Sequence, residues 1–250
     1  MTKFLEILDD KSDLVNRALR IMVGRIEEAI AKRGICTIAL AGGSTPKPLY
    51  EHLASQGLPW EKIHVFWGDE RYVPADHPDS NQRMARQAWL DRVEFPAANI
   101  HPMPTMANDP HSDAATHNEE LRRFFQLTGD EMPQFDIILL GMGDDGHTAS
   151  LFPNTEALDV GDRLITVGNK GDDPRITFTV PLINAARNII FLVAGTNKQP
   201  ALHKIFHENI DPKDYPSKLI QPQDGRLWWL LDADAGEQLS PDEAVYTLKS

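Results

Sequence analysis

His147 is the residue of this sequence best placed for proton transfer. It follows Asp145 by two positions in the segment Gly-Met-Gly-Asp-Asp-Gly-His at 141–147. A carboxylate that accepts a hydrogen bond from one imidazole nitrogen fixes the tautomer of the ring and makes the other nitrogen more basic. The pair therefore predicts a general base. The alternative is an ordinary surface or capping histidine, and the conformationally demanding glycines around His147 favour catalysis over it.

The same segment also matches the dinucleotide-binding pattern G-x-G-x-x-G. That pattern would place a pyrophosphate at the start of the following helix. Asp144 and Asp145 would put negative charge at that point, and Pro153 would end the helix early. We therefore interpret the match as coincidental and predict no cofactor.

A second segment has the composition of a phosphate-binding loop. Gly42, Gly43, Ser44 and Thr45 follow an apolar run and offer backbone amides and hydroxyl groups to an anion. The spacing is not that of a nucleotide P-loop, and a capped turn between a strand and a helix explains the residues equally well. The segment by itself does not identify a ligand.

Charged residues follow other apolar runs. Asp69 and Arg71 are candidates for substrate contact, as an orienting carboxylate and a fixed cation, whereas for the neighbouring Glu70 we favour a solvated salt-bridge turn. Arg175 and Lys198 each begin an element, and each alone reads as a surface cation. Together they would offset the roughly two negative charges of a phosphate.

Apolar runs alternate with amphipathic segments, which predicts an α/β fold with a doubly wound, mostly parallel sheet flanked by helices. The expected strands are 35–41, 63–67, 135–140, 164–167, 175–180, 188–194 and 227–231, and the expected helices are 12–33, 46–54, 80–90, 114–127 and 198–207. Ser12 and Asp13 are the expected caps of the first helix, and Ser80 that of the third. Because ligands bind beyond the carboxyl ends of parallel strands, the loops at 42–45, 68–71, 141–147 and 195–198 should meet at one rim.

The bulk composition limits the partners of the chain. The 250 residues suit a single α/β domain spanning 1–250, with a small subdomain within about 155–185. A formal net charge of −12 and the lack of a long apolar run exclude nucleic acid and membrane as partners. The single cysteine, Cys36, precludes an internal disulfide, so we expect a packed core thiol in a cytoplasmic protein. His101, His111 and His117 lack a tight ligand spacing, which predicts no metal site.

Taken together, the motifs resemble those of the 6-phosphogluconolactonase family over nearly the whole chain. They are Leu-Ala-Gly-Gly-Ser-Thr-Pro at 40–46, Trp-Gly-Asp-Glu-Arg-Tyr-Val-Pro at 67–74 with Ser80-Asn81 following, the segment at 141–153, Arg-Ile-Thr-Phe-Thr at 175–179, and the turn at 195–198. The resemblance implies a Rossmann-like sheet shared with the glucosamine-6-phosphate deaminases, and hydrolysis of 6-phospho-D-glucono-1,5-lactone in the oxidative pentose phosphate pathway.

The resemblance also implies roles for individual residues. Gly43, Ser44, Thr45, Arg175 and Lys198 would hold the phosphate, and His147 would activate water. Asp69, Arg71, Asn81 and Asp145 would line the lactone end, with Arg71 as our candidate for stabilising the oxyanion. Asn81 is implicated by the resemblance alone.

Two other functions stay open at this point. A glucosamine-6-phosphate deaminase or isomerase would carry Asn-Glu-Pro after the Gly-His pair, where this chain has Ser150-Leu-Phe-Pro153, and Phe152 cannot transfer protons. A non-catalytic sugar-phosphate sensor would keep the pocket without turnover, although no basic recognition helix or interaction tail favours it. The expected partner is a small sugar-phosphate lactone, and we expect a monomer or a weak dimer.

Overall fold

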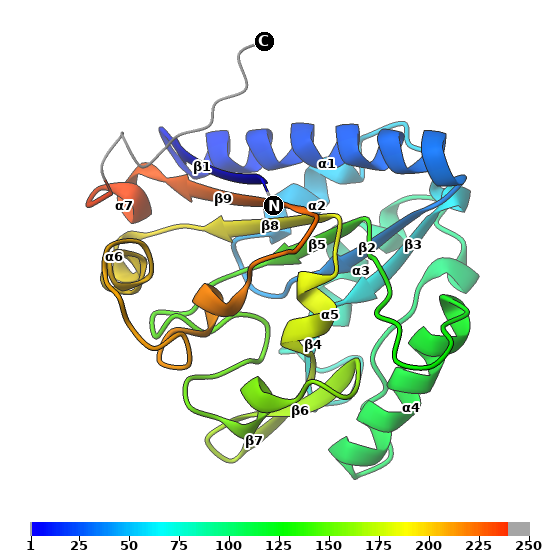
Figure 1. Cartoon of the computed structure of the whole chain (residues 1–250). Helices are drawn as coiled ribbons and strands as arrows, with labels where there is room; N and C mark the ends of the chain where they lie inside the picture. Colours follow the sequence, from blue (N-terminus) through cyan, green and yellow to red (C-terminus); the bar gives the residue numbers. More distant parts are fainter. Residues whose placement is uncertain (1, 240–250) are drawn as a thin grey trace.

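A six-stranded parallel sheet forms the centre of the computed structural model, which describes residues 2–239. The strand order is β1-β9-β8-β5-β2-β3 (Figure 1). The strands are β1 Thr2–Leu8, β2 Cys36–Leu40, β3 Ile63–Trp67, β5 Ile137–Leu140, β8 Asn188–Val193 and β9 Arg226–Asp232. Each strand runs parallel to its neighbours, so all six carboxyl ends lie at the same edge.

A second sheet is small and antiparallel. Its order is β4-β7-β6, with β4 at Asp69–Arg71, β6 at Ile165–Lys170 and β7 at Asp173–Phe178. The segments expected as strands at 164–167 and 175–180 therefore form strands, but they do not join the main sheet. Residues 68–71, expected as a loop, contain β4. Both β6 and β7 fall within 155–185, the range of the predicted subdomain; the division into domains stays a prediction.

Helices cover both faces of the main sheet, as right-handed crossovers between parallel strands require (Figure 1). They are α1 Lys11–Arg33, α2 Lys47–Leu53, α3 Asn81–Ala88, α4 Pro110–Phe124, α5 Val180–Asn184, α6 Gln199–His207 and α7 Ala233–Gly236. Within residues 2–239, no helix combines the length and apolar character needed to cross a bilayer. The predicted doubly wound α/β fold is confirmed.

The core is divided between the two faces of the sheet. Along β9, Trp228 packs with α1 and α2 on one face, while Trp229 packs with α5 and α6 on the other. This alternation follows from the two-residue period of a strand. Trp229 stacks on Phe191 of β8 with ring centroids 3.9 Å apart, which ties neighbouring strands together. The expected core position of Cys36 is also found, since its side chain is buried.

One expected helix cap differs from the structure, and one strand was not predicted. The cap of α1 is Asp10, whose carboxylate accepts from the Asp13 amide, rather than Ser12 or Asp13. Ser80 does cap α3, accepting from the Arg83 amide. The edge strand β1 was not predicted, because Lys3 and Glu6 interrupt its short apolar pattern and its pairing with β9 is a long-range contact.

Candidate active site

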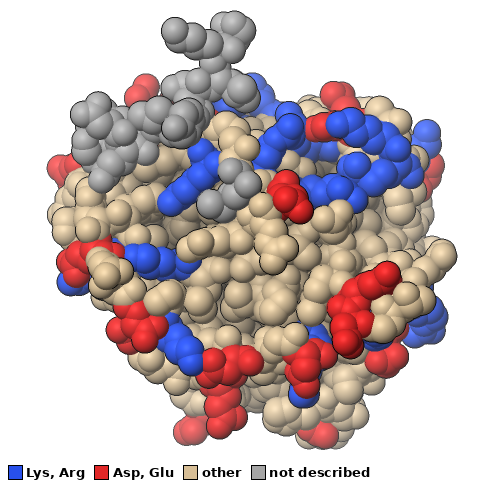
Figure 2. Space-filling model, in the orientation of Figure 1, with Lys and Arg blue, Asp and Glu red and all other residues tan. Residues whose placement is uncertain are grey.

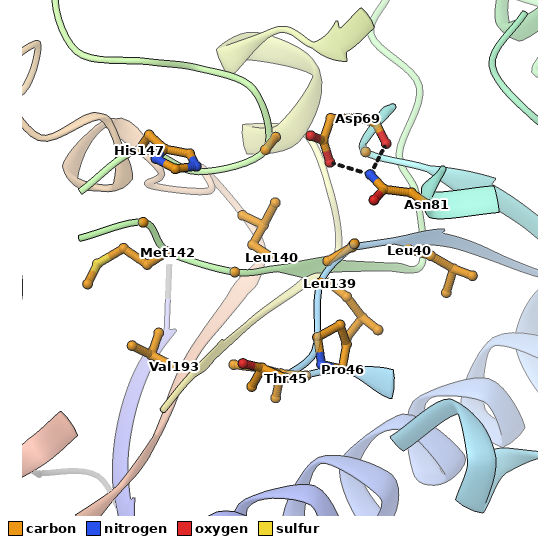
Figure 3. A pocket seen from close by; sticks show the side chains of 18 of the residues that line it. Leu40, Thr45, Pro46, Asp69, Asn81, Leu139, Leu140, Met142, His147 and Val193 are labelled. Carbon is orange, nitrogen blue, oxygen red and sulfur yellow. Dashed lines mark hydrogen bonds between the residues drawn. The ribbon is translucent and has the colours of Figure 1, made fainter. Parts of the chain in front are cut away.

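A pocket of about 280 Å³ opens at the carboxyl edge of the main sheet. It lies near the lower end of the roughly 300–1,000 Å³ typical of small-molecule sites. Figure 3 shows His147, Asp69 and Asn81 on one side and Thr45 and Pro46 across from them. Ten of the predicted site residues line it: Gly42, Gly43, Ser44, Thr45, Asp69, Arg71, Asn81, His147, Arg175 and Lys198. Asp145 does not line the pocket but contacts His147.

The imidazole of His147 is held by Asp145. Asp145 Oδ1 lies 2.6 Å from Nδ1 of the ring and also accepts from the His147 backbone amide at 3.0 Å. Partial burial opposes ionisation of Asp145, but these two contacts with His147 lower the pKa of the carboxyl group below its usual value. With Nδ1–H donating to a carboxylate, Nε2 of the neutral ring carries the free lone pair. The arrangement is that of an oriented general base.

Two neighbours fix the plane of this ring. A Cβ atom at Gly143 would lie 2.0 Å from Nδ1 of His147, so only glycine allows the ring to rest on the backbone there. The Gly143 amide donates to the His147 carbonyl at 2.9 Å, which closes the loop. Phe152 packs beside the ring with centroids 4.5 Å apart. No helix begins directly after the loop, where residues 148–155 form turns, so the G-x-G-x-x-G match lacks the element that binds pyrophosphate.

Asp69 is buried and held by two partners. Ser150 Oγ donates to Asp69 Oδ2 at 2.6 Å, and Asn81 Nδ2 donates to the Asp69 carbonyl at 2.9 Å. A Cβ atom at Gly42 would lie 1.9 Å from Oδ1 of Asn81, so the glycine makes room for this amide. Sequence reasoning missed Ser150 as a partner of Asp69, because nothing local signals a contact across 81 residues.

Glu70 is not the solvated residue that we expected. Its side chain is buried and accepts from the backbone amides of Arg71, Asn81 and Gln82, at 2.7–2.8 Å. Burial raises the pKa of Glu70, and the three amides oppose that shift. The carboxylate satisfies free amides at the start of α3 and thereby holds Asn81 at the pocket. Its role is structural, as expected, but the physical reason is capping rather than solvation.

Arg71 and Arg175 are directly opposite each other on the antiparallel strands β4 and β7. Neither Nε atom has a hydrogen-bond partner, although both are buried, and Arg71 also donates to the Asp79 carbonyl at 2.6 Å. Burial, and then the charge of Arg71, lower the pKa of Arg175. The Arg175 guanidinium lies over the Phe152 ring at 5.5 Å. Two like charges facing each other beside a pocket favour binding of an anion between them.

Lys198 enters the pocket from the other side. It ends the short helical turn Thr196–Lys198 after β8, and its ammonium group forms an ion pair with Asp144. The hydrogen bond from Lys198 lowers the pKa of Asp144, and Asn197 adds a second bond at 2.8 Å. A bound phosphate would therefore compete with Asp144 for Lys198.

The loop at 42–45 lies between β2 and α2. Gly43 has φ +94°, a left-handed conformation that glycine adopts without strain. The hydroxyl of Tyr50 donates to the Ala41 carbonyl at 2.7 Å and accepts from the Ala41 amide at 3.0 Å, which fixes the start of the loop. No side chain caps α2, so its first amides remain available near the pocket.

Three other histidines, His64, His101 and His117, form a separate cluster beside β3. His101 and the fully buried His117 both contact the carboxylate of Glu120, at 3.3 and 3.0 Å, and His64 contacts His101 at 3.2 Å. Hydrogen bonds from His101 and His117 lower the pKa of Glu120 to about 2. In the part of the chain that the structure describes, no group of three His, Cys, Asp or Glu side chains is arranged to hold a metal ion.

A Rossmann-like sheet with a carboxylate-oriented histidine at its carboxyl edge defines the class of protein, an α/β enzyme with its site at the strand ends. Residues 9–229 match the family described as glucosamine-6-phosphate isomerases/6-phosphogluconolactonase. The chain belongs to this family.

Within this family, the relatives most relevant to the chain's activity are named 6-phosphogluconolactonase. The chain is 64% identical over 241 residues to a 6-phosphogluconolactonase of Synechocystis sp., which covers 96% of this chain and 100% of the relative. It is 60% identical over 240 residues to a 6-phosphogluconolactonase of Nostoc sp., with the same coverages. The solved structure of 6-phosphogluconolactonase from Trypanosoma brucei matches with a TM-score of 0.84 at 30% identity, covering 96% of this chain and 99% of that one.

Proposed function

We propose that this chain hydrolyses 6-phospho-D-glucono-1,5-lactone to 6-phospho-D-gluconate, a step of the oxidative pentose phosphate pathway, with His147 as the base that activates water. The observation that carries the proposal is the Asp145–His147 pair at the mouth of a cationic pocket. The high identity to two relatives named 6-phosphogluconolactonase supports the same reaction.

The proposed reaction proceeds through a tetrahedral intermediate. Nε2 of His147 takes a proton from water, and the water oxygen attacks the lactone carbonyl carbon. The bond from that carbon to the ring oxygen then breaks, and the imidazolium returns the proton to the departing oxygen. Asp145 stabilises the imidazolium between these steps. No covalent bond to the enzyme is needed.

Different cations of the pocket bind the two ends of the substrate. We assign Lys198, Arg175 and the loop at 42–45 to the phosphate, and Arg71 to the oxyanion that develops at the carbonyl. Because Arg71 and Arg175 face each other, kinetics must separate their roles. Loss of a phosphate contact chiefly raises KM, whereas loss of an oxyanion contact lowers kcat.

The lactonase proposal is favoured over deamination by the residues that follow His147. Phe152 packs on the imidazole and under Arg175, at the place where the resembling deaminase segment carries a carboxylate. An apolar ring supplies no acid or base for opening an amino sugar.

The test is lactone hydrolysis by the wild type, His147→Ala and the exposed control His111→Ala, with spontaneous opening subtracted. We expect His147→Ala to lose about 10²–10⁴-fold in kcat and the control to keep wild-type activity. Full activity in His147→Ala would remove this residue from the mechanism. Faster release of ammonia from glucosamine 6-phosphate would indicate the deaminase instead, and binding of 6-phosphogluconate without turnover would indicate the sensor.

A further inference from the structure

A second cationic cavity lies at the amino edge of the main sheet, opposite the edge that carries the active site. Figure 2 shows Lys and Arg side chains gathered near the end of α1. The cavity has a volume of about 230 Å³ and is lined by residues from α1, the start of β8 and the start of β9. Its five cations are Arg25, Lys32, Arg33, Arg187 and Arg226.

The local charge is opposite in sign to that of the protein. Three carboxylates accompany the five cations: Glu28 and Asp224 line the cavity, and the buried Asp136 pairs with two of its arginines. Five positive and three negative charges leave an excess of two positive charges, in a chain whose formal net charge is −12. A phosphate monoester carries about −1.5 to −2 at neutral pH, which matches this excess.

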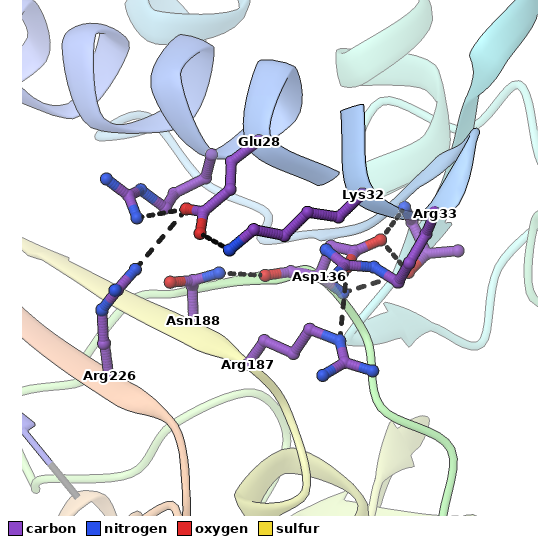
Figure 4. Close-up of polar contacts among 9 residues, drawn as sticks. Glu28, Lys32, Arg33, Asp136, Arg187, Asn188 and Arg226 are labelled. Carbon is purple, nitrogen blue, oxygen red and sulfur yellow. Dashed lines mark hydrogen bonds and ion pairs between the residues drawn. The ribbon is translucent and has the colours of Figure 1, made fainter. Parts of the chain in front are cut away.

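The carboxylates neutralise only part of the positive charge of the cavity (Figure 4). Glu28 contacts Arg25 at 2.5 Å, Lys32 at 2.6 Å and Arg226 at 3.6 Å, so one carboxylate is shared by three cations. Lys32 and Arg226 keep side-chain exposures of 63% and 44% and are free to turn toward a ligand. An anion in the cavity would find donors that no carboxylate saturates.

Asn188 supplies a second and independent indication of a ligand. Its side chain is buried and lines the cavity, and its Nδ2 donates to the Asp136 carbonyl at 2.7 Å. Because a carbonyl can only accept, this bond fixes the orientation of the amide, and Figure 4 shows the oxygen on the side away from Asp136. That oxygen has no hydrogen-bond partner. A buried acceptor without a partner is costly, and a hydroxyl group is the donor it lacks.

The cavity also adjoins a larger and partly apolar one. Arg33, Gln134 and Arg187 line both, and the neighbour, of about 570 Å³, adds Ile35, Phe125, Leu127, Met132 and Pro133. A ligand with an apolar part could place it there while its phosphate stays among the cations.

We propose that this amino-edge cavity binds an organic phosphate that carries a free hydroxyl group, either a sugar phosphate or a nucleotide. The phosphate lies among Arg187, Arg226 and Lys32, and the hydroxyl donates to Oδ1 of Asn188. The site is separate from the lactonase pocket and does not depend on the proposed reaction.

The test is a titration of isotope-labelled full-length protein, followed by NMR, with inorganic phosphate, glucose 6-phosphate and AMP as probes. The side-chain amide of Asn188 and the backbone amide of Arg226 report this cavity, while the amides of Gly143 and Gly146 report the active site. We expect saturable shifts at the first pair, with both organic phosphates binding more tightly than inorganic phosphate. Tighter binding of AMP would identify a nucleotide site, and tighter binding of glucose 6-phosphate a sugar-phosphate site.

The double variant Lys32→Gln/Arg226→Gln removes both excess charges from exposed positions. We expect at least about tenfold weaker binding at the first pair of amides, since the variant removes two charged hydrogen-bond donors to the phosphate. Lactone hydrolysis and the response of Gly143 should stay unchanged. The control Lys62→Gln/Arg92→Gln removes two exposed cations that line neither cavity. No saturable shift at Asn188 and Arg226, unchanged affinity in the double variant, or binding of inorganic phosphate as tight as that of the esters would overturn the proposal.

Discussion

Replacing Asp145 with asparagine tests whether the carboxylate beside His147 is required for catalysis. The two side chains meet at 2.6 Å, so the charge centres of a carboxylate and an imidazolium would be about 4 Å apart. At the effective dielectric constant of a half-exposed pair, between about 20 and 80, their attraction is about 1–4 kcal/mol. Taking about 2 kcal/mol predicts about a thirtyfold loss of kcat, because about 1.4 kcal/mol corresponds to tenfold.

The amide adds a second effect. If its nitrogen faces Nδ1, the ring is driven to the tautomer protonated at Nε2, which cannot accept a proton from water. The loss therefore lies between about thirtyfold and the 10⁴-fold that is roughly the upper range for a general base. Histidine-labelled protein would reveal the tautomer through its ¹⁵N shifts.

The assay is steady-state hydrolysis of the lactone at neutral pH, with the spontaneous rate subtracted. Asp144→Asn is the matched control, because the neighbouring carboxylate pairs with Lys198 rather than with the imidazole. We expect this control to keep kcat and to change KM at most. Wild-type kcat in Asp145→Asn, or an equal loss in both variants, would refute the reasoning.

Gly143→Ala should lower kcat by about tenfold or more without unfolding the protein, because the new methyl group would displace the His147 ring from its position; normal kinetics would contradict the contact. Lys198→Ala should raise KM far more than it lowers kcat, and an unchanged KM would count against the phosphate assignment. The pKa of Glu120 in the folded state is about 2, below the ordinary value near 4.5. Its contribution to the free energy of unfolding is therefore present above pH 4.5 and is lost as the pH falls toward 2. Discounted for partial exposure of the side chain, this contribution is about 1–2 kcal/mol. Thermal melts should therefore show that Tm declines less in Glu120→Gln than in the wild type as the pH falls over that range.

Periodicity and turn chemistry predicted most of the fold. The strand at 63–67 and the cap at Ser80 are as expected, because both depend on residues that are close in sequence. The strand β4 was missed, since Asp69, Glu70 and Arg71 have no apolar pattern and become a strand only by pairing with β7. Local sequence cannot show a partner that lies a hundred residues away.

The contacts of the candidate site were likewise predictable only where the partners are close in sequence. The Asp145–His147 contact was predictable because the partners are only two positions apart in the sequence. The bond from Ser150 to Asp69 was not, because it joins two loops that only the fold brings together. Nor does the sequence show that Ala149, which lines the pocket, has φ +48°. A non-glycine residue in this region costs about 1–2 kcal/mol, which the surrounding contacts must offset.

Phe152 links the shape of the loop to its chemistry. Its ring packs against the imidazole of His147 at a centroid distance of 4.5 Å and fixes the plane of that ring. Phe152 also affects the charge of the pocket. A carboxylate at this position would neutralise Arg175, whose guanidinium lies 5.5 Å from the centre of the ring. With Phe152 in place, burial and the facing Arg71 leave Arg175 as a cation that gains by meeting an anionic substrate. A phenylalanine in place of the deaminase carboxylate therefore has two effects. It removes the proton donor that an amino sugar needs, and it keeps the pocket cationic for a phosphorylated lactone.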